Sequence, residues 1–200
     1  MTGIKDIIFD ISGIFLTTDE KSTLEYYAEK LKVPFEKICK VHESLVNAYD
    51  TNNIKDYEFL KKLFNGINRK VDKNYWKKKL SMKKSRPEMF EFLERVKKKY
   101  PVYFVTNEGS NYWKSVDKKF KIHEKFNGGI ASYEVSISKP DIKIFQAFCK
   151  KFRLQPEDCL FLDDKEKNLD GAEKLGMKTL VFTDIEHLKK DFDRLGIQLS

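Results

Sequence analysis

The sequence has no apolar run that approaches the ~20 residues a helix needs to cross a bilayer. Its first ten residues, MTGIKDIIFD, lack the charged, apolar and small-residue zones of a secretory signal peptide. It also contains no internal repeat and no low-complexity linker. These absences argue against membrane insertion and export, and we expect a cytoplasmic protein that makes no use of a membrane.

Cysteine is scarce. The three cysteines, Cys39, Cys149 and Cys159, are odd in number, widely spaced and without a Cys-x-x-Cys pair. This pattern excludes a disulfide framework and offers no zinc-site spacing. We expect free, mostly buried thiols in a reducing compartment.

The residues present are those of a globular protein, with 40% hydrophobic and 35% charged residues and a formal net charge of +8. Lysine runs at 76–80, 83–86 and 96–100 raise the possibility of a nucleic-acid surface. However, the lysines alternate with apolar residues at helical spacing, so we interpret the runs as solvated helix faces. We therefore expect no dedicated nucleic-acid site, although the charge is compatible with attraction of a small anionic substrate.

Short apolar segments next to turn or helix signals predict buried strands. They lie at residues 4–11, 102–106, 128–135, 159–164 and 178–184. Apolar residues at three- and four-residue spacing predict helices between the later strands, at 87–100, 141–152 and 168–177. Alternation of strand and helix is typical of a parallel α/β sheet.

The region between the first two strands breaks this alternation. About 90 residues there have almost wholly helical spacing, at 22–31, 34–49, 55–64 and 71–80. A single crossover helix needs far fewer residues. We therefore predict an α/β core formed by residues 1–15 and 86–200, with a helical domain of residues 16–85 inserted after the first strand.

Polar side chains follow the predicted strands at their carboxyl ends, where ligands bind in doubly wound sheets. They are Asp10, Thr106 and Asn107, Lys139, and Asp163 with Asp164. A carboxylate nucleophile, magnesium held by acids, and a hydroxyl and a lysine on the phosphoryl oxygens make up a phosphoryl-transfer site. Mg²⁺ prefers oxygen ligands and keeps several waters, so two or three protein oxygens suffice.

The order IIFD, VYFVT, SKP and LFLDD, with a helical insert after the first motif, resembles the haloacid dehalogenase superfamily of hydrolases. The similar branch carries a helical cap between its first two motifs. The resemblance covers the whole chain, and residues 161–177, FLDDKEKNLDGAEKLGM, are its most specific part. It implies a Rossmann-like doubly wound parallel sheet with an inserted all-helical cap domain.

The resemblance also implies catalytic roles. Asp10 would be the nucleophile, forming an aspartyl-phosphate while its other oxygen binds Mg²⁺. Thr106 would hydrogen-bond a phosphoryl oxygen, and Lys139 would neutralise charge there and orient Asp10.

A metal site and substrate contacts are implied in the same way. Asp164 would bind Mg²⁺ directly. Asp163 would either bind it directly or contact one of its ligands, and Asn168 would support the site. The backbone carbonyl of Ser12 would be a further magnesium ligand. Contacts to the substrate are expected from Asn107, Ser12 and Gly13.

Ser12 departs from the family pattern, because phosphatases of this superfamily usually carry an aspartate there. That aspartate protonates the leaving group and then deprotonates the attacking water, and a serine hydroxyl is too weak an acid to replace it. General acid–base catalysis is worth ~10²–10⁴-fold, so we expect a slower enzyme rather than an inactive one. Some capped relatives also carry a small residue there. A substitute acid could come from Glu108 or Asp19, although surface positions are the plainer interpretation of both.

The leading hypothesis is a Mg²⁺-dependent phosphomonoester hydrolase of a small phosphorylated metabolite, a sugar or nucleotide phosphate. The alternatives are a catalytically impaired protein that binds a phosphate ligand or another protein, a 2-haloacid dehalogenase and a phosphomutase. Dehalogenases of the family carry an aromatic residue in the place of Ser12 and need no metal, and phosphomutases need the acid that Ser12 replaces. The substrate, the residues that set specificity and the choice between monomer and homodimer remain open.

Overall fold

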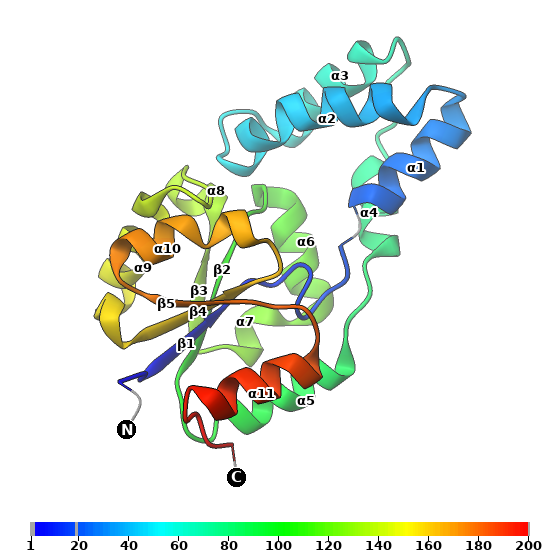
Figure 1. Cartoon of the computed structure of the whole chain (residues 1–200). Helices are drawn as coiled ribbons and strands as arrows, with labels where there is room; N and C mark the ends of the chain where they lie inside the picture. Colours follow the sequence, from blue (N-terminus) through cyan, green and yellow to red (C-terminus); the bar gives the residue numbers. More distant parts are fainter. Residues whose placement is uncertain (1–2, 19, 200) are drawn as a thin grey trace.

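The computed structural model describes residues 3–18 and 20–199, and its centre is a parallel sheet in the order β3-β2-β1-β4-β5 (Figure 1). The strands are β1 (Asp6–Phe9), β2 (Val102–Thr106), β3 (Gly128–Ala131), β4 (Cys159–Asp163) and β5 (Lys178–Val181). Phe9 of the central strand pairs with Phe104 of β2 and with Leu162 of β4. This register brings the carboxyl ends of three neighbouring strands to the same level.

Helices cover both faces of the sheet, as the doubly wound prediction requires. Ile8, Val105 and Phe161 face α9 (Ile142–Phe152) and α10 (Asp170–Leu175). On the opposite face, Phe9 and Phe104 belong to a larger cluster. Its helices are α5 (Pro87–Val96), α6 (Ser110–Phe120), α7 (Ile122–Lys125) and α11 (Ile185–Arg194). Alternation of side chains along each strand divides the core in this way.

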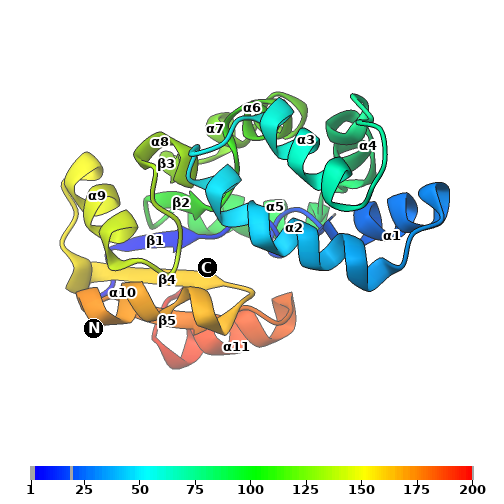
Figure 2. The same ribbon diagram turned by 90° about the horizontal axis from the view of Figure 1, so that it is seen from above.

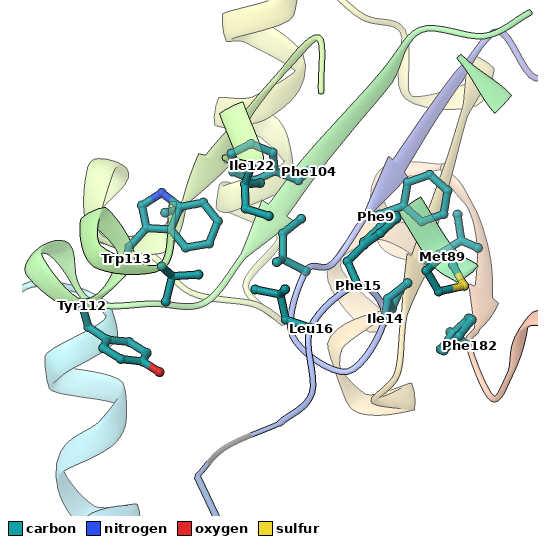
Figure 3. Packing of buried hydrophobic residues seen from close by; sticks show 14 of the residues in the cluster. Phe9, Ile14, Phe15, Leu16, Met89, Phe104, Tyr112, Trp113, Ile122 and Phe182 are labelled. Carbon is teal, nitrogen blue, oxygen red and sulfur yellow. The ribbon is translucent and has the colours of Figure 1, made fainter. Parts of the chain in front are cut away.

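Phe15 anchors the segment after β1 to the larger cluster. Figure 3 shows its ring among Phe9, Ile14 and Met89. The ring centroids of Phe9 and Phe15 are 5.2 Å apart in an edge-on arrangement. The chain therefore turns tightly beyond β1, which holds residues 10–13 against the end of the sheet.

Between this turn and α5 the chain forms the helical insert, named here for α1 (Glu20–Leu31), α2 (Phe35–Asp50), α3 (Asp56–Gly66) and α4 (Tyr75–Met82). Figures 1 and 2 show these helices grouped beyond the sheet, on the side to which β1 runs. Their shared core is largely aromatic and includes Tyr27, Phe59, Phe64 and Tyr75. Each of the predicted helices of this region is present, with ends shifted by a few residues.

The two connections of the helical insert run side by side. Thr17 N–H donates to the Lys84 carbonyl at 2.8 Å, and Arg86 N–H donates to the Phe15 carbonyl at 2.8 Å. This pairing lies next to the predicted boundaries 15/16 and 85/86. The division into two domains there stays an interpretation.

The predicted strands 4–11, 128–135, 159–164 and 178–184 are all longer than the observed strands, and the end of 128–135 is helical instead. β3 ends at Ala131, and residues 132–135 form a turn of helix, α8 (Ser132–Val135). The Glu134 carboxylate accepts a hydrogen bond from Ala131 N–H at 3.1 Å, and the Ser132 hydroxyl donates to the Asp50 carbonyl at 2.7 Å. Side chains that bond to nearby backbone compete with a strand ladder and end it here.

The remaining elements are short 3₁₀ turns, η1 (Pro156–Asp158) and η2 (Glu166–Asn168). The predicted helix 168–177 is therefore a 3₁₀ turn followed by α10. The cysteines are unpaired as expected, with Cys149 and Cys159 buried and Cys39 half-buried. Across residues 3–18 and 20–199, no helix has the length and apolarity of a membrane span.

Candidate active site

Lys139 lies between two carboxylates at the carboxyl end of the sheet. Its Nζ is 2.8 Å from Asp10 Oδ1 and 2.5 Å from Asp163 Oδ2. The three residues are at most 5% exposed. A buried charge is costly unless it is paired, so each of these groups depends on the others for its burial.

Burial and the neighbouring charges shift the pKa values of both Asp10 and Lys139. Burial raises the pKa of Asp10 from its usual 3.8 to about 6, although the charge of Lys139 opposes this rise. Burial alone would lower the pKa of Lys139, but the charges of Asp10 and Asp163 outweigh it and leave the pKa raised. Lys139 thus stays cationic and favours the ionised form of Asp10, the form that a nucleophile requires.

A third carboxylate completes an acidic cluster. One oxygen each of Asp10, Asp163 and Asp164 lie within 4.8 Å of one another. Asp164 Oδ1 is buried and has no hydrogen-bond partner among the described residues. Gly13, with φ 97°, makes this approach possible, since a Cβ there would lie 2.3 Å from Asp164 Cγ. An all-oxygen cluster of this size with an unpartnered oxygen fits Mg²⁺.

Asp163 is already fully bonded within the protein. Its Oδ1 accepts from Lys165 N–H at 2.9 Å, and Asn168 Nδ2 lies 3.0 Å from Oδ1 and 3.1 Å from Oδ2. Asn168 therefore holds the carboxylate of Asp163 and fixes its orientation. Of the predicted metal residues, Asp10 and Asp164 have the oxygens best placed for direct binding.

The polar residues after β2 have different surroundings. Thr106 is 1% exposed, and its Oγ1 has no hydrogen-bond partner among the described residues. Asn107 instead uses its amide to hold the backbone of Lys139, donating to its carbonyl at 3.0 Å and accepting from its N–H at 2.9 Å. Thr106 thus offers a buried, unused hydroxyl, whereas Asn107 fastens the loop that carries Lys139.

Ser12 belongs to a cluster that the sequence did not indicate. Its Oγ accepts from Lys83 Nζ at 3.0 Å and lies 3.4 Å from Glu108 Oε1. Lys83 and Glu108 are 2% and 6% exposed, so the surface interpretation was wrong for both. The other candidate for the missing acid, Asp19, lies outside the described residues.

Lys79 is a second exception to the predicted solvated faces, because it is 7% exposed. The sequence carried a signal for Lys79 alone. Lys79 lies four residues after the buried Tyr75 and so shares its face of α4, whereas Lys83 follows the end of that helix with extended backbone. Lys79 Nζ lies 4.4 Å from the centroid of the Tyr112 ring, which links α4 to α6.

These groups line one cavity of about 730 Å³ between the end of the sheet and the helical insert. Asp10, Thr106, Lys139 and Asp164 line it from the sheet side together with Ser12 and Glu108. Asn47, Asp50 and Lys79 line it from the helical insert. Of the predicted site residues, all but Asp163 and Gly13 line this cavity. Asp163 bonds to Lys139 and Asn168 of the lining, and Gly13 lies against Asp164.

A solved structure shares this architecture along nearly the whole chain. A haloacid dehalogenase family enzyme of Bacteroides thetaiotaomicron, crystallised as a magnesium complex, superposes with a TM-score of 0.80 at 25% identity. The match covers 94% of this chain and 99% of that one.

Two curated proteins illustrate the range of similar sequences. A chloroplast flavin mononucleotide hydrolase of Arabidopsis thaliana is 28% identical over 89 residues, 44% of this chain and 36% of that protein. An (S)-2-haloacid dehalogenase of Burkholderia cepacia is 26% identical over 95 residues, 47% of this chain and 41% of that protein. The chain thus matches less than half the length of either relative.

A match to a whole family supports a firmer statement than any one relative. The sequence profile of the haloacid dehalogenase-like hydrolases matches residues 7–182, which span the sheet from β1 to the end of β5 and all of the helical insert. The chain therefore belongs to the haloacid dehalogenase-like hydrolase family.

Proposed function

We propose that this protein is a magnesium-dependent phosphomonoester hydrolase that acts on a small phosphorylated metabolite through an aspartyl-phosphate on Asp10. One observation carries the proposal. Asp10, held by Lys139, shares a cavity with two buried oxygens that have no partner among the described residues, Asp164 Oδ1 and Thr106 Oγ1. Buried polar atoms are normally hydrogen-bonded, so unpartnered ones point to a ligand.

Each group has a role in this reaction. Asp10 attacks phosphorus, and the ester oxygen leaves with the rest of the substrate. Thr106 donates a hydrogen bond to a phosphoryl oxygen, and Lys139 supplies positive charge beside it. Mg²⁺ bound by Asp10 and Asp164, with Asp163 behind them, would neutralise phosphoryl charge and orient the phosphoryl group. Water then attacks the aspartyl-phosphate, which releases inorganic phosphate and restores Asp10.

We assign the helical insert the role of a cap that closes over the substrate. The described residues that line the cavity include no aromatic side chain, and Val46 and Pro140 are its apolar members. A flavin or a nucleobase would find no ring to stack on, whereas hydroxyl groups would meet amides, carboxylates and lysines. The lining thus favours a sugar or polyol phosphate over a nucleotide.

The first test is turnover of p-nitrophenyl phosphate with and without Mg²⁺ by the wild type and by Asp10→Asn. This substitution removes the nucleophile and barely changes volume. We expect Mg²⁺-dependent turnover that falls at least ~10⁴-fold in the variant, since covalent catalysis requires the carboxylate. Asp193→Asn, which alters an exposed acid on α11, is the matched control and should turn over like the wild type.

Other results would assign other functions. Metal-independent halide release from a 2-haloacid, without ester hydrolysis, would assign carbon–halogen hydrolysis to Asp10. If neither substrate reacts, binding is tested by thermal unfolding with Mg²⁺ and inorganic phosphate. Stabilisation by both together would then identify a phosphate-binding protein.

A further inference from the structure

A carboxyl group from another strand end lies beside Ser12, where relatives carry an acid. Ser12 is two residues after Asp10, in a turn closed by Gly13 N–H donating to the Leu16 carbonyl at 2.7 Å. Its hydroxyl lies 3.4 Å from Oε1 of Glu108, and both residues line the cavity that contains Asp10. The space next to the Ser12 side chain is thus occupied by a carboxyl group after all.

The backbone of Glu108 is firmly held. Its N–H donates to Ser132 Oγ at 3.0 Å, and that hydroxyl in turn donates to the Asp50 carbonyl of α2 at 2.7 Å. The next residue is Gly109, where a Cβ would lie 2.3 Å from the ring of Tyr49. The loop of residues 107–109 is therefore held by β2, α8 and the helical insert together. A residue that transfers protons requires such a fixed position.

Lys83 and Ser12 orient the carboxyl group. Lys83 Nζ lies 3.0 Å from Ser12 Oγ and 4.0 Å from Glu108 Oε1, and its side chain is fully buried. An ammonium group can only donate hydrogen bonds. Because Ser12 Oγ accepts from Lys83, its own hydrogen points elsewhere, and Glu108 Oε1 is the acceptor beside it. Ser12 thus connects a lysine of the helical insert to the carboxyl group at the end of β2.

We infer that Glu108 is the general acid and base of this protein, in place of the acid that Ser12 replaces, with Ser12 and Lys83 as positioning residues. The inference rests on the proposed function. As Asp10 attacks phosphorus, the bond to the leaving oxygen breaks and the Glu108 carboxyl gives that oxygen its proton. When water attacks the aspartyl-phosphate, the Glu108 carboxylate takes a proton from it and the bond from phosphorus to Asp10 breaks. Glu108 ends protonated, as it began.

The test compares leaving groups of different basicity. kcat/KM, which reports formation of the aspartyl-phosphate and not its hydrolysis, is measured for the wild type and for Glu108→Gln on p-nitrophenyl phosphate, phenyl phosphate and an alkyl phosphate such as glycerol phosphate. A basic alkoxide needs a proton and a nitrophenolate hardly does. We expect Glu108→Gln to lower kcat/KM by ~10²–10⁴-fold for the alkyl phosphate and by less than about tenfold for p-nitrophenyl phosphate. With the latter substrate, loss of the base should also produce a burst of nitrophenol as the aspartyl-phosphate accumulates.

Two further variants separate catalysis from folding. Glu108→Asp keeps a carboxyl group beside Lys83 but withdraws it by one methylene, so the variant should fold and still lose mainly the alkyl ester reaction. The double variant Ser12→Asp/Glu108→Gln moves the carboxyl group to position 12 at unchanged net charge. It should recover at least about tenfold of the alkyl phosphate activity that Glu108→Gln loses. Glu88→Gln, an exposed acid on α5, is the remote control.

The outcomes separate the two claims. An equal loss of kcat/KM for all three esters in Glu108→Gln, or no loss for any, would overturn the role of Glu108 while leaving the phosphatase intact. Failure of the double variant to exceed Glu108→Gln would also count against it. A wild type that hydrolyses none of the esters would overturn the proposed function, and the role of Glu108 with it.

Discussion

Individual residues in the site divide into those that bond to other site residues and those with one buried polar atom left unpartnered. Asp163 bonds to both Lys139 and Asn168, so the geometry of these three residues is fixed before any ligand arrives. Thr106 Oγ1 and Asp164 Oδ1 have no partner within residues 3–18 and 20–199. The first group builds the frame, and the second marks the positions expected for the phosphoryl group and the cation.

Thr106→Val should separate stability from activity. The substitution keeps the shape of the side chain and removes a buried hydroxyl that bonds to nothing in the protein. We expect unfolding stability to stay equal or rise by about 1 kcal/mol, because an unsatisfied buried group is lost. Loss of a hydrogen bond to a charged phosphoryl oxygen should lower kcat/KM by ~10–100-fold. Chemical unfolding and kinetics on p-nitrophenyl phosphate test this, and destabilisation with normal kinetics would assign Thr106 a structural role.

Asp164→Asn should likewise separate stability from function, in this case from the binding of Mg²⁺. Burial and the charge of Asp163 raise the pKa of Asp164, so its ionised form disfavours the metal-free fold. The variant without metal should therefore be at least as stable as the wild type at neutral pH. The wild type should gain stability as Mg²⁺ is added, and the variant should gain little. Melting temperature measured against Mg²⁺ concentration tests both, and an equal gain in the variant would rule out Asp164 as a ligand.

Site residues at the ends of strands could be predicted from the sequence. Site residues whose burial depends on contacts between the helical insert and the sheet could not. Asp10, Thr106 and Asp163 follow apolar strands, and the parallel sheet alone brings them to one edge. Lys83 follows α4 in a lysine run, and local sequence cannot show that its stem packs inward. Glu108 is buried because Lys83 and Ser12 meet it, so its burial depends on contacts far apart in sequence.

At the scale of elements, strands β1 to β4 were predictable because both of their faces are buried, whereas β5 at the edge of the sheet has no buried residue. Continuous apolar runs of this kind are typical of parallel sheets. The end of β3 was missed, since Ser132 and Glu134 end it through contacts with α2 and with the backbone. The spacing of apolar residues predicted the helices of the insert but not their packing. Aromatic side chains set that packing, including the stacked pair Tyr49 and Trp76 with centroids 4.7 Å apart.

The contact between α2 and the loop after β2 can be tested with a double-mutant cycle. Gly109 has φ −75° and ψ 156°, which any residue adopts, so Gly109→Ala is penalised only through the Tyr49 ring. We expect Gly109→Ala to destabilise the protein by about 1–3 kcal/mol, as overpacking does. In the background of Tyr49→Ala the same change should cost under about 0.5 kcal/mol, giving a coupling energy above about 1 kcal/mol.

Urea unfolding of the four proteins gives this coupling. Gly3→Ala is the control, because nothing lies within 4 Å of a Cβ at that position. Additive effects of the two substitutions would show that Tyr49 does not hold this loop. Activity should fall together with stability in Gly109→Ala, since Glu108 is the preceding residue.

For the whole molecule, the fold class followed from the order of strands and helices, but the cavity did not. The cavity exists because the helical insert meets the end of the sheet, and that meeting depends on side chains from segments more than 30 residues apart in sequence, such as Ser12 and Lys83. Its mouth carries the exposed lysines Lys21, Lys165 and Lys167. The exposed acids Glu20 and Glu43 also line the cavity, so these lysines individually, and not a net positive charge of the cavity, would attract a phosphate ester.

The charge of these lysines should make substrate capture sensitive to salt. The Debye length shortens from roughly 30 Å at 0.01 M salt to roughly 10 Å at 0.1 M, so the attraction of an anionic ester weakens as salt is added. We expect kcat/KM to fall several-fold, up to about tenfold, over this range while kcat stays constant, because bound substrate no longer needs steering. Lys165→Gln/Lys167→Gln should flatten the dependence. Lys98→Gln/Lys190→Gln removes the same charge beside α5 and on α11, so this variant should retain most of the salt dependence of kcat/KM. Equal flattening by both pairs would show that net charge, and not the lysines at the mouth, attracts the substrate.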